Sequence, residues 1–142
     1  WNPEAKKHTQ IERRFMLIGQ TSDGMRVLDI LRGLQAVRAT SDLQGKSIRL
    51  RASGAMGALA CYAAMFETGL DLELAQMPVT HRDGPYLLNI SKVMEVPQAV
   101  LLAAHANTLQ LTTSSPEAWQ AVKDAAARLG WPDSQLRIVT AK

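Results

Sequence analysis

The stretch that decides the fold runs from residue 46 to residue 66 and reads K-S-I-R-L-R-A-S-G-A-M-G-A-L-A-C-Y-A-A-M-F. A short run with apolar residues at Ile48, Leu50 and Ala52 is typical of a strand. The turn at 53–57 then brings two glycines, and the missing Cβ lets the backbone bend sharply and a helix lie close to a strand. The run beyond it has almost no polar side. The stretch therefore predicts a strand, a tight turn and a buried helix.

The rest of the chain alternates in the same way. Caps, glycine stops and short apolar runs delimit the expected elements, which are helices over 21–37, 54–68, 86–94, 97–104 and 116–129 and strands over 48–52, 70–75, 108–112 and 136–139. Strands that alternate with helices pair in parallel through right-handed crossovers. We expect an α/β fold, with three αβα layers around a partial, mostly parallel sheet. It forms a single domain over residues 1–142, with 1–20 as an N-terminal extension.

Two of the helices carry clear start signals. Thr21, Ser22 and Asp23 supply an N-cap and a first-turn acid, and Ser115 stands at the cap before Pro116 and Glu117. Apolar residues at spacings of three predict the buried stripe of the first helix, which is Met25, Leu28, Leu31 and Leu34.

The composition excludes several classes of protein. The chain has 142 residues, of which 46% are hydrophobic and 20% charged, as in ordinary globular domains. It has a single cysteine, Cys61, which rules out an internal disulfide and a cysteine-built metal site. Cys61 lies in the apolar helix, where we expect a buried, inert thiol. We expect neither a metal nor a cofactor.

The charge balance bears on the partners. The net charge is +3, and the basic residues near the start alternate with acids and lack an aromatic platform, the residues being Lys6, Lys7, Arg13, Arg14, Glu4 and Glu12. This pattern indicates a solvated basic face, so we expect no nucleic-acid partner. No apolar run is long enough to cross a bilayer, and we expect no membrane partner.

The chain begins at Trp1 and not at a methionine. We therefore expect a processed or truncated piece of a longer protein, with any targeting signal upstream of it.

With its strand, glycine-containing turn and apolar helix, the chain resembles the C-terminal half of an α/β-hydrolase. The nearest relatives in character are acetyl xylan esterase-like and dienelactone hydrolase-like proteins. The resemblance rests on residues 19–29 (G-Q-T-S-D-G-M-R-V-L-D), 48–65 and 81–88 (H-R-D-G-P-Y-L-L). It implies a carboxylic ester hydrolase lineage, and by analogy with exported relatives it slightly favours an extracytoplasmic location.

The nucleophile of that superfamily sits in a G-x-S-x-G elbow. Laid on this sequence, the pattern places Ala52 at the first glycine, Gly54 at the nucleophile and Met56 at the last glycine. The nucleophile is therefore missing, and the resemblance implies a degenerate elbow. Ser53 lies one residue early and is a candidate for a displaced nucleophile.

The other members of a Ser-His-acid triad are also missing from their usual places. The family acid follows the strand expected at 108–112, where this chain has Thr113, Ser114 and Ser115. The family histidine follows the last strand, beyond which only residues 140–142 remain. No complete triad can be carried over, and whether the chain is an enzyme stays open.

A loop at 81–83 offers other candidates, because it follows a strand at the carboxyl end of the sheet, where open α/β folds bind ligands. His81 and Asp83 could act as displaced catalytic groups, and Arg82 could hold a substrate carboxylate. The alternative is that Asp83 caps a helix beginning near Pro85 and pairs with Arg82.

The parent fold has further strands before the one at 48–52, so one edge of this sheet is expected to be open. The remainder of the parent polypeptide, a second copy or another subunit would complete the sheet.

Three functions remain. The chain is a hydrolase that needs groups supplied by another segment, a catalytically silent hydrolase fold (a pseudoenzyme) kept for assembly or for holding a carbohydrate ester, or a small-molecule or phosphate binder. The last would use the turn at 54–57 and the loop at 81–83, with Gly54, Ala55 and Arg82 as ligand contacts.

Overall fold

The structure is a computed structural model, and it describes residues 5–141. Trp1 and Glu4 of the sequence analysis lie outside the described residues, as does the side chain of Lys6. The helices are α1 (Ala5–Leu17), α2 (Ser22–Ala39), α3 (Gly54–Ala64), α4 (Val96–Ala106) and α5 (Gln120–Arg128). The strands are β1 (Ile48–Ser53), β2 (Leu70–Ala75), β3 (Thr108–Thr113) and β4 (Leu136–Thr140). Three short 3-10 turns complete them, η1 (Ser41–Leu43), η2 (Ile90–Lys92) and η3 (Pro116–Trp119).

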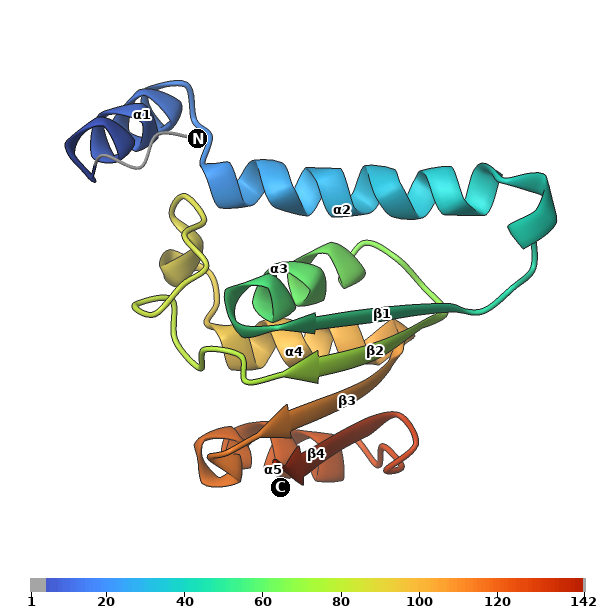
Figure 1. The fold of residues 1–142 in the computed structure, drawn as a ribbon. Coiled ribbons are helices and arrows are strands. Elements are labelled where there is room, and N and C mark those ends of the chain that lie inside the picture. Colours follow the sequence, from blue (N-terminus) through green and yellow to red (C-terminus); the bar gives the residue numbers. More distant parts are fainter. Residues whose placement is uncertain (1–4, 142) are drawn as a thin grey trace.

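The four strands form one parallel sheet in the order β1-β2-β3-β4 (Figure 1). Each neighbouring pair is connected by a helix, and successive right-handed crossovers in this order place all connecting helices on the same face. The expected α/β class with a partial sheet is confirmed. The described residues supply the sheet and one helical layer of a partial three-layer fold, with α2 packed on the outside of α3.

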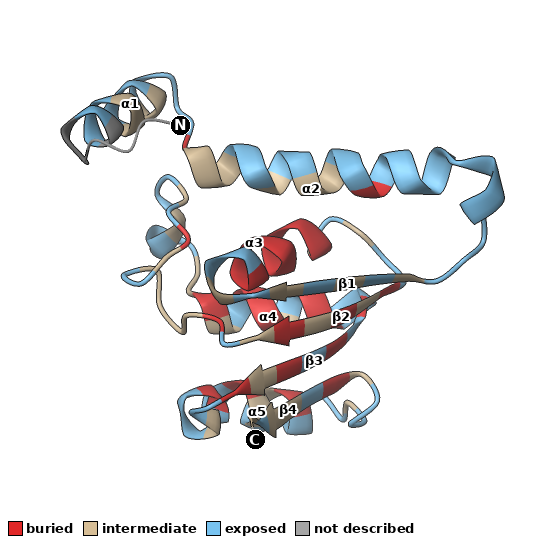
Figure 2. Cartoon of the chain, viewed as in Figure 1, coloured by how far each residue is buried: buried red, intermediate tan, exposed pale blue. Residues whose placement is uncertain are grey.

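The two faces of the sheet differ sharply. Leu72, Leu74 and Leu111 are fully buried beneath the helices, because side chains of a strand alternate between faces. The alternate positions form a polar face with no helical cover in the described part of the chain, and they are Arg49, Arg51, Asp71, Glu73, Thr108, Gln110, Thr112 and Arg137. Figure 2 shows along the strands how more buried positions alternate with less buried ones.

Helix α3 lies at the centre of the core. All residues from Gly57 to Ala64 are buried, as expected for a helix without a polar side. It is covered by α2, α4, β1 and β2, so the expectation of cover on more than one side is confirmed. It ends at Ala64, four residues before the expected 68, and Gly69 at φ +71° turns the chain into β2.

Helix α2 corrects an expectation. Leu34 is buried, whereas Met25 and Leu28 are 41% and 52% exposed. The face that packs on the core is instead formed by Val27, Ile30 and Leu34. The helix packs mainly on α3, and its two ends are tied by Asp23 to the N–H of Tyr86 and by Arg38 to Glu67, so only a narrow side of it is covered.

The helix expected over residues 86–94 is also wrong, because only the short turn η2 forms there. On α1, Lys7, Arg13 and Arg14 are exposed, in line with a solvated basic face.

Candidate functional site

The strand-helix junction has the geometry of an elbow. Gly54, the first residue of α3, has φ +57°, a conformation that residues with a Cβ adopt only at a cost. At Gly57 an added Cβ would lie 2.9 Å from Cγ of Met77, so α3 packs closely on the segment after β2. The roles predicted for the two glycines, a sharp bend and a close approach, are confirmed.

Ser53 ends β1 in an extended conformation, with φ −140° and ψ 161°. Its side chain makes no capping hydrogen bond to α3 and is exposed. It belongs to the polar face, where it lines a shallow cavity of about 430 Å³ together with Arg51, Glu73 and Thr112. The hydroxyl is therefore accessible, but Ala75 stands across from Ser53 on β2, and the polar groups of the cavity lining include the Arg51–Glu73 ion pair and Thr112.

His81 is committed to hydrogen bonds on both ring nitrogens. The carbonyl of Pro85 can only accept, so Nδ1 carries the proton and donates to it over 2.9 Å. Nε2 of this tautomer then accepts from the Tyr62 hydroxyl over 2.8 Å. The backbone N–H of His81 donates to Oε2 of Glu95 over 3.0 Å. His81 thus fastens the 81–85 loop to α3 and to the start of α4.

Tyr62 and Glu95 are two members of this cluster that the sequence analysis missed. Burial raises the pKa of Tyr62, with smaller effects of the same sign from Cys61 and Glu95, so its hydroxyl stays protonated and can donate. Glu95 also forms a capping box with Gln98 at the start of α4. The sequence E-V-P-Q at 95–98 carries the signal of that box, an acceptor at the cap and a glutamine three residues later.

The structure does not assemble a Ser-His-acid set from the sequence candidates. Ser53 faces the polar side of the sheet, whereas His81 is held against α3 on the helical side. Arg82 and Asp83 are exposed, and within residues 5–141 their side chains form no ion pair with each other. The alternative for Asp83 is wrong as well, because no helix starts near Pro85 for it to cap.

The loop and the elbow do come together. An added Cβ on Gly84 would lie 4.0 Å from Cβ of Ala55, so the 81–85 loop passes beside the first turn of α3. A cavity of about 490 Å³ lies between the loop and the segment that follows it, and its lining includes His81, Arg82 and Glu95.

At the place where the resemblance predicts the catalytic acid, after β3, uncharged side chains link the ends of two strands by hydrogen bonds. Oε1 of Gln76 accepts from the N–H of Ser114 over 3.1 Å and from its hydroxyl over 3.3 Å. Gln76 has φ +46°, and its N–H donates to the carbonyl of Thr112 over 2.8 Å. This joins the ends of β2 and β3 and leaves no carboxylate there.

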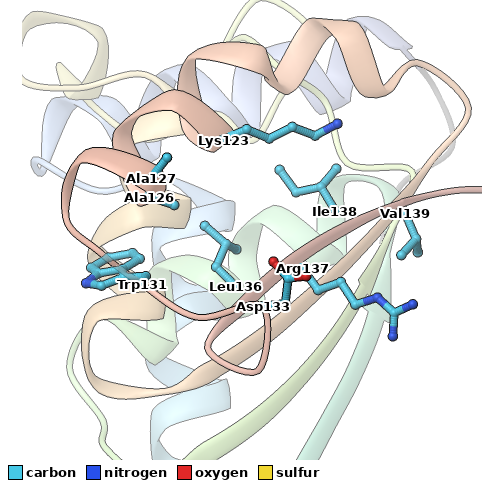
Figure 3. Close-up of a pocket in the computed structure, with 9 residues that line it drawn as sticks. All are labelled: Lys123, Ala126, Ala127, Trp131, Asp133, Leu136, Arg137, Ile138 and Val139. Carbon is cyan, nitrogen blue, oxygen red and sulfur yellow. The ribbon is translucent and has the colours of Figure 1, made fainter.

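Another cavity, of about 440 Å³, lies at the far edge of the sheet between α5 and β4 (Figure 3). Its apolar residues are flanked by one acid and two bases, the lining being Lys123, Ala126, Ala127, Trp131, Asp133, Leu136, Arg137, Ile138 and Val139. None of the sequence candidates lines it.

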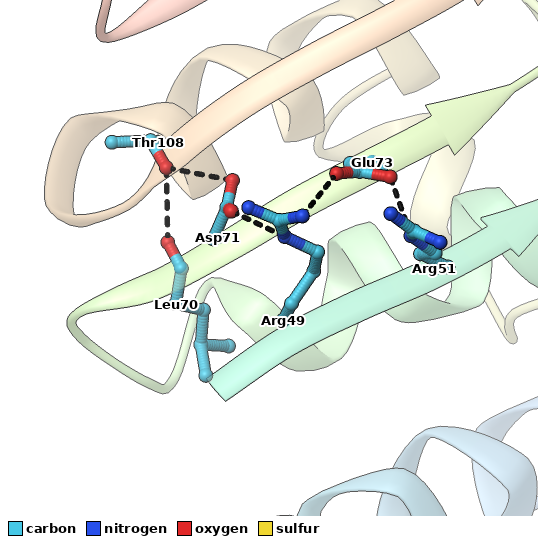
Figure 4. A network of polar contacts seen from close by, with 6 residues as sticks. All are labelled: Arg49, Arg51, Leu70, Asp71, Glu73 and Thr108. Carbon is cyan, nitrogen blue, oxygen red and sulfur yellow. Dashed lines mark hydrogen bonds and ion pairs between the residues drawn. The ribbon is translucent and has the colours of Figure 1, made fainter. Parts of the chain in front are cut away.

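The polar face carries a ladder of charges (Figure 4). Nε of Arg49 lies 2.7 Å from Oδ2 of Asp71, and Nη1 of Arg49 lies 3.1 Å from Oε1 of Glu73. Arg51 pairs with Glu73 as well, and the Thr108 hydroxyl donates to Asp71 over 3.2 Å. The hydrogen bond and the charge of Asp71, together with the charge of Glu73, raise the pKa of Arg49.

The described side chains contain no group of three or more His, Cys, Asp or Glu that could hold a metal ion. None of the helices within residues 5–141 is long and apolar enough to span a membrane.

Comparison with protein-family models, with curated proteins and with solved structures gives no match to this chain.

Proposed function

We propose that the chain is an α/β-hydrolase-like unit of the acetyl xylan esterase lineage that is catalytically silent on its own. It serves as part of a larger protein or assembly that continues the sheet beyond β1. The observation that carries the proposal is Gly54, a glycine at φ +57° in the strand-helix bend where hydrolases of this kind place their nucleophile. A glycine at this position keeps the backbone shape of the elbow but has no side chain that could act as the nucleophile.

The surroundings of the elbow support the silent state. A hydroxyl nucleophile needs a base within hydrogen-bond reach. Ser53 has no such partner among the described residues, and the ring of His81 is occupied by Tyr62 and Pro85.

The test is hydrolysis of 4-nitrophenyl acetate and of acetylated xylan by the purified chain. We expect no turnover above the buffer rate, and no difference between the chain and its Ser53→Ala variant. Turnover that Ser53→Ala removes would contradict the proposal, because it would identify Ser53 as a working nucleophile.

A second candidate, a carbohydrate or small-molecule binding module, is favoured by one observation. The 81–85 loop lies beside the first turn of α3, and Arg82 on this loop is one of the residues that line a cavity of about 490 Å³. Titration calorimetry with acetylated xylo-oligosaccharides tests it, and binding that weakens about tenfold in Arg82→Ala but not in Arg128→Ala would support it. If the oligosaccharide gives the same heat with the native chain and with both variants as it gives in buffer alone, the binding function is excluded.

A further inference from the structure

The free edge of β1 is a surface that can bind another strand. Within residues 5–141, β1 pairs with β2 alone, in register from Ile48 with Leu70 to Ser53 with Ala75 (Figure 1). The backbone groups on its other side therefore have no strand partner in the described chain. An exposed edge of this kind accepts an added strand through main-chain hydrogen bonds.

The helix-facing side chains of β1 are incompletely covered. Ile48, Leu50 and Ala52 are half-buried, whereas Leu72 and Leu111 on the inner strands have 0% exposure. A strand added beside β1 would bury more of this apolar surface if its own helix-facing residues were apolar.

The charged side chains of the polar face indicate which charges the added strand should carry. Arg49 and Arg51 stand directly across from Asp71 and Glu73 in the β1-β2 register, and opposite charges across a strand pair stabilise it. Both arginines share Glu73, and their side chains remain 55% and 67% exposed (Figure 4). Acidic residues on the other side of β1 would repeat the arrangement that β2 already provides.

A second copy of β1 fits this edge poorly. In a two-fold antiparallel pairing with matching faces, positions 49, 51 and 53 of one strand meet the same positions of the other. Every register that pairs most of the two strands then sets arginine against arginine, which destabilises the pair.

We infer that the free edge of β1 binds a strand of alternating apolar and acidic residues, with its carboxylates beside Arg49 and Arg51 on the polar face. The inference rests on the proposed function in that it names the chemistry of the segment that continues the sheet.

The test uses a fluorescein-labelled peptide, acetyl-Thr-Val-Glu-Val-Glu-Val-Thr-amide, whose charge pattern reads the same in both directions. Anisotropy gives the affinity for the full chain, and amide chemical shifts of the ¹⁵N-labelled chain locate the peptide. We expect the largest shifts at residues 48–53 and an affinity about tenfold above that of the same peptide with lysine for glutamate. Methylation of the peptide nitrogens should abolish binding, because an added strand needs its N–H groups.

The matched variants are Arg51→Gln and Arg137→Gln. Both remove one exposed arginine from the polar face, but Arg137 lies on β4, at the opposite edge. We expect Arg51→Gln to lower the affinity for the acidic peptide about fivefold and Arg137→Gln to change that affinity by less than about twofold. Circular dichroism and thermal unfolding of each variant check that the fold is kept.

Each contrary result has a distinct meaning. Equal binding of the acidic and lysine peptides would overturn the inference but leave the sheet-completing role intact. A chain that binds neither peptide and dimerises with amide shifts at 48–53 would overturn the inference in favour of a second copy. No binding and no self-association would overturn both the inference and the sheet-completing role. The esterase assay tests separately whether the chain is catalytically silent.

Discussion

Asn107 is a single side chain that joins three elements. Its Oδ1 accepts from the N–H of Leu70 over 2.9 Å, at the start of β2. Its Nδ2 lies 3.0, 3.1 and 2.8 Å from the carbonyl oxygens of Ala64, Glu67 and Ala103. The residue is 5% exposed, and its hydrogen bonds to Leu70, Ala64 and Ala103 are buried.

We expect Asn107→Ala to lower the free energy of unfolding by roughly 2 to 4 kcal/mol, because buried backbone groups lose their partners. Urea unfolding followed by circular dichroism measures the change. Asn107→Asp should be at least as damaging, since a carboxylate oxygen would face three carbonyl oxygens. A loss below about 0.5 kcal/mol in both variants would show that the backbone finds other partners.

Gly57 tests the close approach at the elbow. Gly57→Ala places a methyl group 2.9 Å from Cγ of the buried Met77, and we expect a loss of about 1 to 3 kcal/mol from overpacking. The double variant Gly57→Ala/Met77→Ala should be more stable than the sum of the two single effects predicts, because the smaller residue leaves room. Additive effects in the double-mutant cycle would show that the contact does not limit packing.

At the scale of elements, helix starts that look alike in sequence differ in the structure. Thr21 caps α2, where its Oγ1 accepts from the N–H of Gly24 over 2.9 Å. Ser115 stands at the predicted cap, but its side chain makes no capping bond and its own N–H donates to Oγ1 of Thr113. The difference arises because η3, not a regular α-helix, follows Ser115.

We therefore expect Thr21→Ala to destabilise the chain by about 1 kcal/mol and Ser115→Ala to stay within about 0.5 kcal/mol. Chemical unfolding of the two variants under the same conditions makes the comparison. Equal losses would mean that the hydroxyl of Ser115 contributes through a contact other than a cap.

At the scale of the whole molecule, the buried core makes stability depend on alkaline pH. Burial raises the pKa of Cys61 from 9.0 to about 12. The unfolded chain releases the thiol proton above pH 9 while the folded chain keeps it, so ionisation favours unfolding. This contribution to stability is complete below pH 9 and is lost as the pH rises toward 12.

We expect the free energy of unfolding to fall more steeply with pH above pH 9 in the native chain than in Cys61→Ala. The difference in slope should approach about 1.4 kcal/mol per pH unit. Urea unfolding at intervals from pH 7 to pH 10.5 measures it. Parallel slopes would mean that the thiol is already reachable by solvent in the folded chain.

Much of the fold could be predicted from local patterns. The strand at 70–75 matches β2 to the residue, and the junction at 53–57 matches the β1-α3 elbow, because alternation and paired glycines act over a few residues. The charge ladder of Arg49, Asp71 and Glu73 could not, because it depends on which strands are neighbours and in which register. The candidate site was the part least predictable from the sequence, because the role of His81 depends on Tyr62, nineteen residues earlier in the chain.

The sequence by itself determined the parallel α/β class, the glycine-containing bend at Gly54 between strand and helix, and the buried character of α3. These follow from side-chain size, polarity and spacing along a short stretch. Only the tertiary structure decided that His81 is fully hydrogen-bonded, that Met25 and Leu28 face outward, and that one face of the sheet carries a ladder of ion pairs. Such properties depend on which distant segments meet, and packing between elements sets that choice.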